Sequence, residues 1–236
     1  MRKPKVCILL NKISEYNFQT LLKNYLPKNK FDVIVTDKFP KNASIFNLII
    51  PWSYQKLIRN INKFNNVVVF HSSNLPHGRG WSPIYYSIKE NNSKYFITGI
   101  IASEKVDLGD VIIRASFKIL PQYNAEFLRK VDNELSLILI KKILKKWPDG
   151  KFNSSKQKGK ASYRPRRFSK DNEIKISKTF NSILPHLRAV ESNNPAFFYY
   201  KGIKFLITIF PEKKPIFPNN IKIEYPGLNK IEYLKK

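Results

Sequence analysis

The chain has 236 residues, of which 42% are hydrophobic, so it can form one sizeable domain with a buried core. Its 43 lysines and arginines outnumber 17 aspartates and glutamates, and the resulting net charge of +26 favours anionic partners. One cysteine, Cys7, excludes an intrachain disulfide, and no stretch approaches the ~20 apolar residues of a membrane helix. We therefore expect a soluble, cytoplasmic protein without a signal peptide.

The positive charge is spread along the chain. Most of it comes from lysines scattered among asparagines and isoleucines, a bias that an AT-rich genome also produces. Only residues 151–167 are locally dense in cations, whereas a nucleic-acid-binding protein more often concentrates its charge on one element. The charge alone is compatible with nucleic acid, with a phosphorylated small molecule, or with neither.

Short β-branched runs in the first half predict buried parallel strands. The run at 6–10 precedes a helical pattern of apolar residues between Phe18 and Leu26, and further runs lie at 31–37, 47–52 and 66–73. This alternation predicts an α/β fold with a Rossmann-like, doubly wound, mostly parallel sheet. The first loop has no G-x-G-x-x-G, so no dinucleotide site is predicted there.

The second half begins with two strand-like pieces within 95–119, separated by a turn at 107–109. Asn124 can cap a long helix that runs to Trp147, and Gly150 ends it. Its spacing predicts one buried stripe. The stripe consists of Leu128, Val131, Leu135, Leu139, Ile143 and Trp147.

The composition from 151 to 162 indicates a linker or mobile loop. Two hairpins follow, with turns at Lys201–Gly202 and at Pro226–Gly227, and we expect them to form a small C-terminal unit. We divide the chain into a catalytic core over 1–160 and an extension over 161–236. The extension contains a helix and the hairpins and offers a possible dimer contact.

Three polar side chains at turns are the candidate catalytic groups. His71 ends the strand run "VVVFH" in a position where open α/β sheets bind ligands, Asn74 follows it, and Asp107 lies in the tight turn before Gly109. A lone histidine is more often structural, and the aspartate could form an Asx turn. The serines beside His71 lack a nucleophile elbow, and three scattered histidines with one distant cysteine offer few zinc ligands, so we predict no metal.

The order of several segments resembles the folate-dependent formyltransferases. "HSSNLPHGRGWSPI" (71–84) is similar to the pattern that follows the family's catalytic strand, and "TGIIASEKVDLGDVII" (98–113) to the segment that presents its catalytic aspartate. "LIIPWSYQKLI" (48–58) looks like the strand and turn that line the pterin pocket. "SYRPRRFSKDNEIKISKTF" and the residues up to 207 are similar to the segment after the core in the tRNA and sugar enzymes.

The resemblance implies transfer of a formyl group from 10-formyltetrahydrofolate, the cosubstrate, to a primary amine. His71 would stabilise the oxyanion of the tetrahedral centre, and Asp107 would orient the imidazole and help move the amine's proton. One residue departs from the family, which has an asparagine two residues before the histidine where this chain has Val69. Asn74 is the candidate for the missing amide; otherwise the chain binds folate but catalyses poorly, or water fills the gap.

By the same resemblance, a pterin pocket and a substrate-binding turn can be assigned. Arg79 and Gly80 match the substrate turn, although a purely structural turn is an alternative. Apolar residues of the pocket could equally be ordinary core. The candidates for cofactor binding are Trp52, Tyr54, Leu57, Ile58, Val106 and Gly109.

The acceptor implied by the resemblance is a nucleotide-linked aminosugar. The length and composition of the extension favour it over the other acceptors of the family. Only 46 residues follow Val190, too few for the barrel of the tRNA enzymes, while the glycinamide ribonucleotide enzymes lack the Arg-rich segment. We expect a dTDP-4-amino-4,6-dideoxyglucose substrate for O-antigen synthesis, with a homodimer as the assembly. Arg164, Arg166 and Arg167 are candidates for its diphosphate, unless that loop is merely solvated. The alternatives are a methionyl-tRNA formyltransferase-like enzyme and a non-catalytic RNA-binding protein on the same scaffold.

Overall fold

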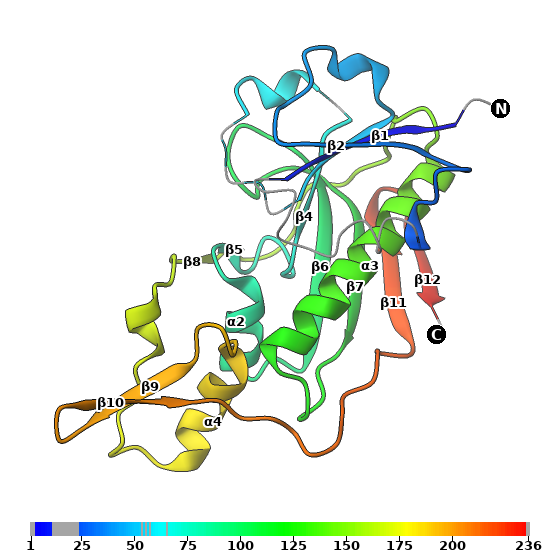
Figure 1. The fold of residues 1–236 in the computed structure, drawn as a ribbon. Helices are drawn as coiled ribbons and strands as arrows, with labels where there is room; N and C mark the ends of the chain where they lie inside the picture. The colour runs from blue at the N-terminus through cyan, green and yellow to red at the C-terminus, as the bar shows by residue number, and fades with distance from the viewer. Residues whose placement is uncertain are drawn as a thin grey trace.

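The first half of the chain forms a small parallel sheet (Figure 1). β1 (Lys5–Leu9) lies between β2 (Asp32–Thr36) and β3 (Leu48–Pro51), and a parallel bridge from Ile49 to Val67 leads on to β4 (Val68–His71). These strands confirm the predicted runs and the α/β class. The helix predicted between Phe18 and Leu26 lies mainly outside the described residues. The computed structural model describes residues 3–10, 24–52, 54, 56, 58–64 and 66–234.

The second half of the sheet is antiparallel. β4 pairs with β6 (Lys94–Ile101), β6 with β7 (Val111–Lys118), β7 with β11 (Ile221–Tyr225) and β11 with β12 (Lys230–Leu234). The prediction of a mostly parallel sheet therefore holds for the N-terminal strands only. The connection from β6 to β7 is too short for a crossover helix, which parallel pairing requires.

One long helix, α3 (Ala125–Lys146), covers the sheet (Figure 1). Its cap is the predicted one, since Asn124 Oδ1 accepts a hydrogen bond from the Phe127 backbone N–H at 2.9 Å. All six residues of the predicted stripe are buried, from Leu128 to Trp147. The periodicity is thus explained by packing of this face on the apolar strands, which forms the main core.

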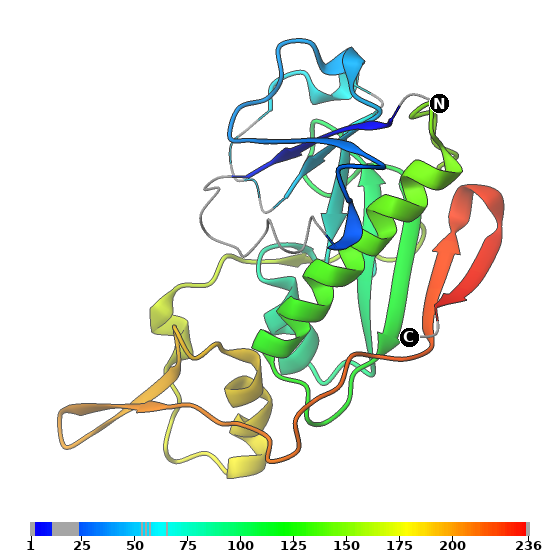
Figure 2. The ribbon, with the colours of Figure 1, turned by 45° about the vertical axis from the view of Figure 1, so that its right-hand side comes forward.

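The extension forms a satellite unit with a core of its own. Here α4 (Phe180–Ala189) packs on α2 (Pro83–Lys89), and β9 (Ala196–Tyr200) forms a hairpin with β10 (Ile203–Ile207). Ile174, Leu187 and Ala196 are buried at its centre. The hairpin projects away from the sheet (Figure 2).

The second predicted hairpin does not belong to this unit, which corrects the expectation that both hairpins form one C-terminal body. β11 and β12 complete the core sheet beside β7 instead (Figure 2). Alternate residues of β11 are buried, namely Ile221, Ile223 and Tyr225, so this strand gains its stability from the core. The open edge of β7 supplies the hydrogen bonds.

The segment 151–162, predicted to be a linker or mobile loop, lies against the core. Ser155 and Val111 exchange backbone hydrogen bonds of 2.9 and 2.8 Å. A Cβ atom on Gly227 would lie 2.5 Å from the backbone of Asn153, so the turn between β11 and β12 packs closely against this segment. The loop is therefore held at a fixed place beside the β6–β7 connection.

Short elements complete the description. β5 (Arg79–Gly80) pairs in parallel with β8 (Tyr163–Arg164). Within the described ranges, the structure contains no helix long and apolar enough to cross a membrane. The 3₁₀ helices are η1 (Ala43–Ile45), η2 (Ile61–Lys63), η3 (Ser169–Asn172) and η4 (Pro226–Leu228).

Candidate active site

The site is built where two strands of the central sheet end. His71 is the last residue of β4 and pairs with Thr98 of β6, while Asp107 lies in the connection between β6 and β7. Both side chains are more than nine-tenths buried. Residues 36 positions apart in the sequence thus share one buried polar site.

The imidazole of His71 lies between two oxygen atoms. Its Nδ1 is 3.4 Å from Asp107 Oδ1, and its Nε2 is 2.8 Å from the carbonyl oxygen of Gly78. The other carboxylate oxygen of Asp107, Oδ2, accepts a hydrogen bond of 2.8 Å from the Gly80 backbone N–H. The structure therefore brings the two predicted catalytic groups together, and the carboxylate also holds the turn that follows the histidine.

Backbone conformation explains why the aspartate reaches the histidine. Asp107 adopts a left-handed conformation, with φ of 59°, which aspartate tolerates better than most residues. Gly109 allows the tight approach, since a Cβ atom there would lie 1.6 Å from the carbonyl oxygen of Ile101. Gly80 likewise leaves no room for a side chain, because its Cβ would be 2.5 Å from the Arg164 carbonyl oxygen.

The turn after His71 is fixed from the neighbouring strands. Thr98 Oγ1 donates a hydrogen bond of 2.6 Å to the Ser73 carbonyl, and the Arg114 guanidinium donates one of 2.8 Å to the Leu75 carbonyl. The bond between Leu75 and Pro76 is cis. These contacts hold residues 73–76 against β6 and β7, so the carbonyl of Gly78 returns to the imidazole.

A second buried carboxylate lies behind the histidine on α3. Asp132 Oδ1 accepts a hydrogen bond of 2.8 Å from the hydroxyl of Tyr95, a fully buried residue of β6. Burial raises the pKa of the Asp132 carboxyl, and its hydrogen bonds with Ser72 and Tyr95 act in the opposite direction. Sequence reasoning missed this pair, because an acid inside a helix carries no local sign of its buried partner.

The candidate for the third catalytic group, Asn74, does not lie with the pair. Asn74 is exposed and lines a cavity of about 230 Å³ whose wall is formed by the turn at 73–78, α2, the start of β6 with the residues before it, and Arg164, without His71 or Asp107. Val69 lies on the same strand face as His71, and its side chain packs against Leu75 and other apolar residues. The structure thus shows no side-chain amide of residue 69 or 74 beside the imidazole.

Gln157 is the site residue that sequence reasoning overlooked. Its amide nitrogen donates hydrogen bonds to the carbonyl oxygens of Asp107 and Gly109, at 2.8 and 2.9 Å. Its amide oxygen accepts a hydrogen bond of 2.6 Å from Arg79. Arg79 is therefore engaged by the protein, and its guanidinium also lies over the ring of Tyr163. A glutamine in a polar segment gives no signal of such long-range contacts.

The predicted pterin-pocket residues fall into two groups. Tyr54 and Ile58 pack against the apolar cluster that also contains Ala102 and Val69, next to the β6–β7 connection. Trp52 is buried in the main core instead. The tip of the connection is apolar and accessible, with Val106 70% and Leu108 37% exposed. Leu57 lies outside the described residues.

The three arginines predicted to bind phosphate stack on aromatic rings. Arg164 lies over Tyr86 and forms an ion pair of 2.7 Å with Glu90. Arg167 lies over Tyr85, and it donates hydrogen bonds to Asn172 and to the carbonyl of Asp171. These two arginines fasten the segment 163–168 to α2, which corrects the view of this loop as merely solvated.

Arg166 differs from its neighbours. It is exposed, and its guanidinium lies 4.8 Å from the ring centre of Trp81 and 5.6 Å from that of Phe168. Both rings are about half exposed. Of the three predicted phosphate ligands, Arg166 therefore presents the most accessible cation, beside two accessible aromatic faces.

The other two histidines are not part of this site. His77 is exposed, whereas His186 of α4 is buried and its Nδ1 lies 2.8 Å from the hydroxyl of Tyr85. Burial lowers the pKa of His186. This histidine joins α4 to α2, which is a structural role.

Comparison with known proteins shows which of them are similar to this chain in sequence or in fold. No protein-family model matches the chain. Its sequence is 30% identical over 132 residues to a methionyl-tRNA formyltransferase from Mycoplasma capricolum, a match that covers 56% of this chain and 38% of that enzyme. A 4-N formyltransferase from Francisella tularensis superposes with a TM-score of 0.69 at 19% identity, covering 89% of this chain and 99% of that one.

The chain has the formyltransferase fold. HypX from Aquifex aeolicus, solved in complex with tetrahydrofolic acid, shares it with a TM-score of 0.69 and 19% identity, over 91% of this chain and 40% of that protein. The fold that the formyltransferase resemblance implied is thereby confirmed. The chain matches well under half the length of the curated tRNA enzyme from Mycoplasma capricolum, so activity and substrate are matters for proposal.

Proposed function

We propose that this chain is an N-formyltransferase that moves the formyl group of 10-formyltetrahydrofolate to the primary amine of a nucleotide-linked aminosugar. The observation that carries the proposal is the contact between the buried His71 imidazole and the Asp107 carboxylate, placed at the ends of adjacent segments of a formyltransferase fold. The buried site excludes much of the surrounding water, which strengthens electrostatic interactions with a developing charge.

The two side chains supply different parts of the chemistry. Attack of a neutral amine on the formyl carbon gives a tetrahedral centre with a negative oxygen and a positive nitrogen. When this centre collapses, the bond from the formyl carbon to N10 of the folate breaks, the amine loses a proton, and N10 takes up a proton as tetrahydrofolate leaves. His71, oriented by Asp107 through Nδ1, presents Nε2 as the donor to the oxyanion once the Gly78 carbonyl gives up that nitrogen. Asp107 provides the negative charge toward which the amine's proton leaves through water.

The surroundings of the pair fit a reduced pterin. Tyr54 and Ile58 share an apolar cluster with Ala102, and the exposed apolar tip at Val106 and Leu108 follows directly along the chain. A flat heterocycle can be enclosed by such side chains. The neighbour solved with tetrahydrofolic acid supports folate as the cosubstrate.

The nucleotide part of the acceptor is supported by the surface next to the active site. Trp81 follows Gly80, whose N–H holds the catalytic carboxylate, and Arg166 lies between Trp81 and Phe168. Accessible aromatic rings can stack a nucleobase, and arginine is suited to phosphate oxygens. The Francisella enzyme, a 4-N formyltransferase, supports an amine at position 4, and a sugar N-formyltransferase from a Shewanella species with the same fold supports a sugar acceptor. We propose dTDP-4-amino-4,6-dideoxyglucose for O-antigen synthesis.

A methionyl-tRNA formyltransferase-like activity is the second candidate, favoured by the sequence match to the Mycoplasma enzyme and by the net charge of +26. Incubation with the formyl donor and a panel of amines separates the two. We expect a mass gain of one formyl group on a dTDP-aminosugar, lost in His71→Asn and Asp107→Asn. Formylation of charged initiator tRNA alone would overturn the sugar substrate, and no transfer to any amine would overturn the activity. RNA binding that falls steeply with salt, without transfer, would favour the non-catalytic alternative.

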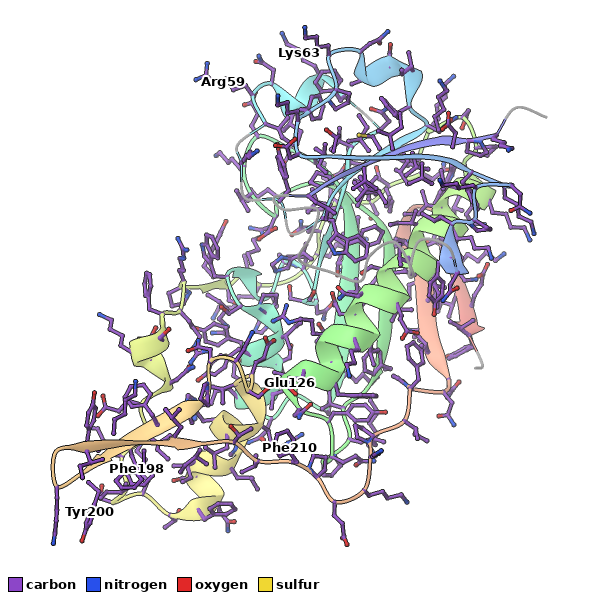
Figure 3. The ribbon with its side chains drawn as sticks, in the orientation of Figure 1. Arg59, Lys63, Glu126, Phe198, Tyr200 and Phe210 are labelled. Atoms are coloured by element: carbon purple, nitrogen blue, oxygen red, sulfur yellow. The ribbon has the colours of Figure 1, made fainter. Side chains whose placement is uncertain are left out.

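We also propose that the protein forms a homodimer through the β9–β10 hairpin. Tyr200 lies near the tip of the hairpin, which projects from the end of the molecule opposite to Arg59 and Lys63 (Figure 3). Its exposed apolar side chains include Ile203 and Leu206, at 62% and 64% exposure. Sedimentation should show a dimer that Leu206→Glu dissociates, and a wild-type monomer would overturn this assembly.

A further inference from the structure

We infer that Gln157 is the positioning residue that holds the Asp107 carboxylate against His71. The inference deepens the proposed function, on which its catalytic meaning rests. Gln157 comes from the segment 151–162, far along the chain from both catalytic groups, yet its side chain contacts the connection that carries one of them.

The contact geometry is that of a clamp. The two hydrogens of the Gln157 amide reach the carbonyls on either side of residue 108, at 2.8 Å for Asp107 and 2.9 Å for Gly109. Asp107 has a left-handed backbone conformation, so the peptide group that follows it is oriented differently from that of a residue with a right-handed or extended backbone. Because Gln157 binds the carbonyl of that same peptide, it stabilises the conformation that points the carboxylate toward the imidazole.

Arg79 fixes the amide from the other side. Its guanidinium donates to the amide oxygen at 2.6 Å, which leaves the amide nitrogen facing the two carbonyls. The donors and acceptors match in one orientation of the amide only. The residue after Arg79 is Gly80, whose backbone N–H donates a hydrogen bond to Asp107 Oδ2. Gln157, Arg79 and Gly80 therefore form one short network that contacts both the backbone and the carboxylate of Asp107.

The backbone of the segment 151–162 is bound to the core, and this fixes the position of Gln157. Ser155, two residues before Gln157, pairs with Val111 at the start of β7. Asn153 Oδ1 accepts a hydrogen bond of 3.0 Å from the indole of Trp147, and Gly227 packs on the backbone at 153–154. The glutamine is thus placed by the core sheet and by α3, rather than by a free loop.

Substitution of Gln157 tests the inference, with Lys158→Ala as the matched control because Lys158 is the exposed next residue. Gln157→Ala removes both donors. Gln157→Glu keeps the length but places oxygens against two carbonyls. We expect kcat to fall about 10- to 100-fold in both variants, with KM for the formyl donor changed by less than about threefold, since misplacement of a catalytic group by about 1 Å costs that much in rate. Lys158→Ala should match the wild type.

A readout independent of transfer separates this inference from the proposed function. The ring signals of the three histidines are followed by NMR, with His71→Asn identifying those of residue 71. Gln157→Ala should move the His71 signals in the same direction as Asp107→Asn, and Lys158→Ala should leave them in place. If no amine is formylated by the wild type, the proposed function fails while this comparison still decides the clamp.

Two results would overturn the inference. One is that both Gln157 variants leave the His71 signals at their wild-type positions. The other is that the signals move but kcat stays within twofold of the wild type. Thermal unfolding identifies a variant that does not fold, and the Gln157→Glu protein, with a side chain of nearly the same volume, then carries the test.

Discussion

Replacement of Asp107 by asparagine is the most direct perturbation of the site. Asparagine has nearly the same shape, so its carbonyl oxygen can still accept the hydrogen bond that the Gly80 N–H donates to Asp107 Oδ2. What is lost is the negative charge 3.4 Å from His71 Nδ1. The variant therefore removes the electrostatic contribution while keeping the turn.

The magnitude follows from the distance. A full positive charge on the imidazole at 3.4 Å from the carboxylate would be stabilised by about 5 kcal/mol at an effective dielectric constant of ~20. If the transition state loses about half of this stabilisation when the carboxylate becomes an amide, the loss is roughly 2.5 kcal/mol, or about 50- to 100-fold in kcat. Loss of all of it would give more than about 1,000-fold.

The assay is steady-state transfer of the formyl group to the aminosugar, with Asp110→Asn as the control. Asp110 is a nearby acid in the same connection, and its backbone carbonyl, which the substitution keeps, accepts the hydrogen bond from Ile101. We expect Asp110→Asn to keep at least half of the wild-type kcat. An Asp107→Asn protein that retains more than a third of the wild-type kcat would refute the electrostatic role assigned to this contact.

Three further variants test the site and the fold. Gly109→Ala should lower Tm by about 5 °C and abolish transfer, since its Cβ would lie 1.6 Å from a carbonyl oxygen; an unchanged melting curve would contradict the close approach. Two lysines that bond Glu232 lower its pKa to about 2, so Glu232→Gln should lower the free energy of unfolding by about 1 kcal/mol at pH 7. This difference should shrink as pH falls from 4.5 toward 2, and a constant difference in urea titrations would contradict it. Val69→Asn, which places an amide on the face of His71, should raise kcat by about tenfold if an oxyanion donor is missing; equal or lower rates would argue against that gap.

Local patterns predicted the individual elements well, because period and caps are properties of neighbouring residues. The buried stripe of α3, its Asn124 cap and both hairpin turns are visible in the sequence and confirmed in the structure. The pairing of β11 with β7 was not predictable in this way, since the partners are about 100 residues apart and nothing local states which edge is open.

The candidate site shows the same division. His71 and Asp107 stand out as polar residues at strand ends, and the structure brings them together. Gln157 and Asp132 did not stand out, since each acts through partners distant in sequence. The prediction that the clustered arginines bind phosphate was misleading in part. Composition reveals the positive charge but not the carboxylates and aromatic rings that already contact it, as Glu90 contacts Arg164.

The place of β11 in the sheet has a consequence for how the protein is made. β7 is buried along most of its length, and β11, synthesised about 100 residues later, covers its outer edge. During translation, the backbone groups on that edge stay without their final partner until residue 225 has left the ribosome. A nascent chain of this kind exposes an apolar strand with one unpaired edge for several seconds at ordinary elongation rates, which is the interval in which a chaperone would be needed.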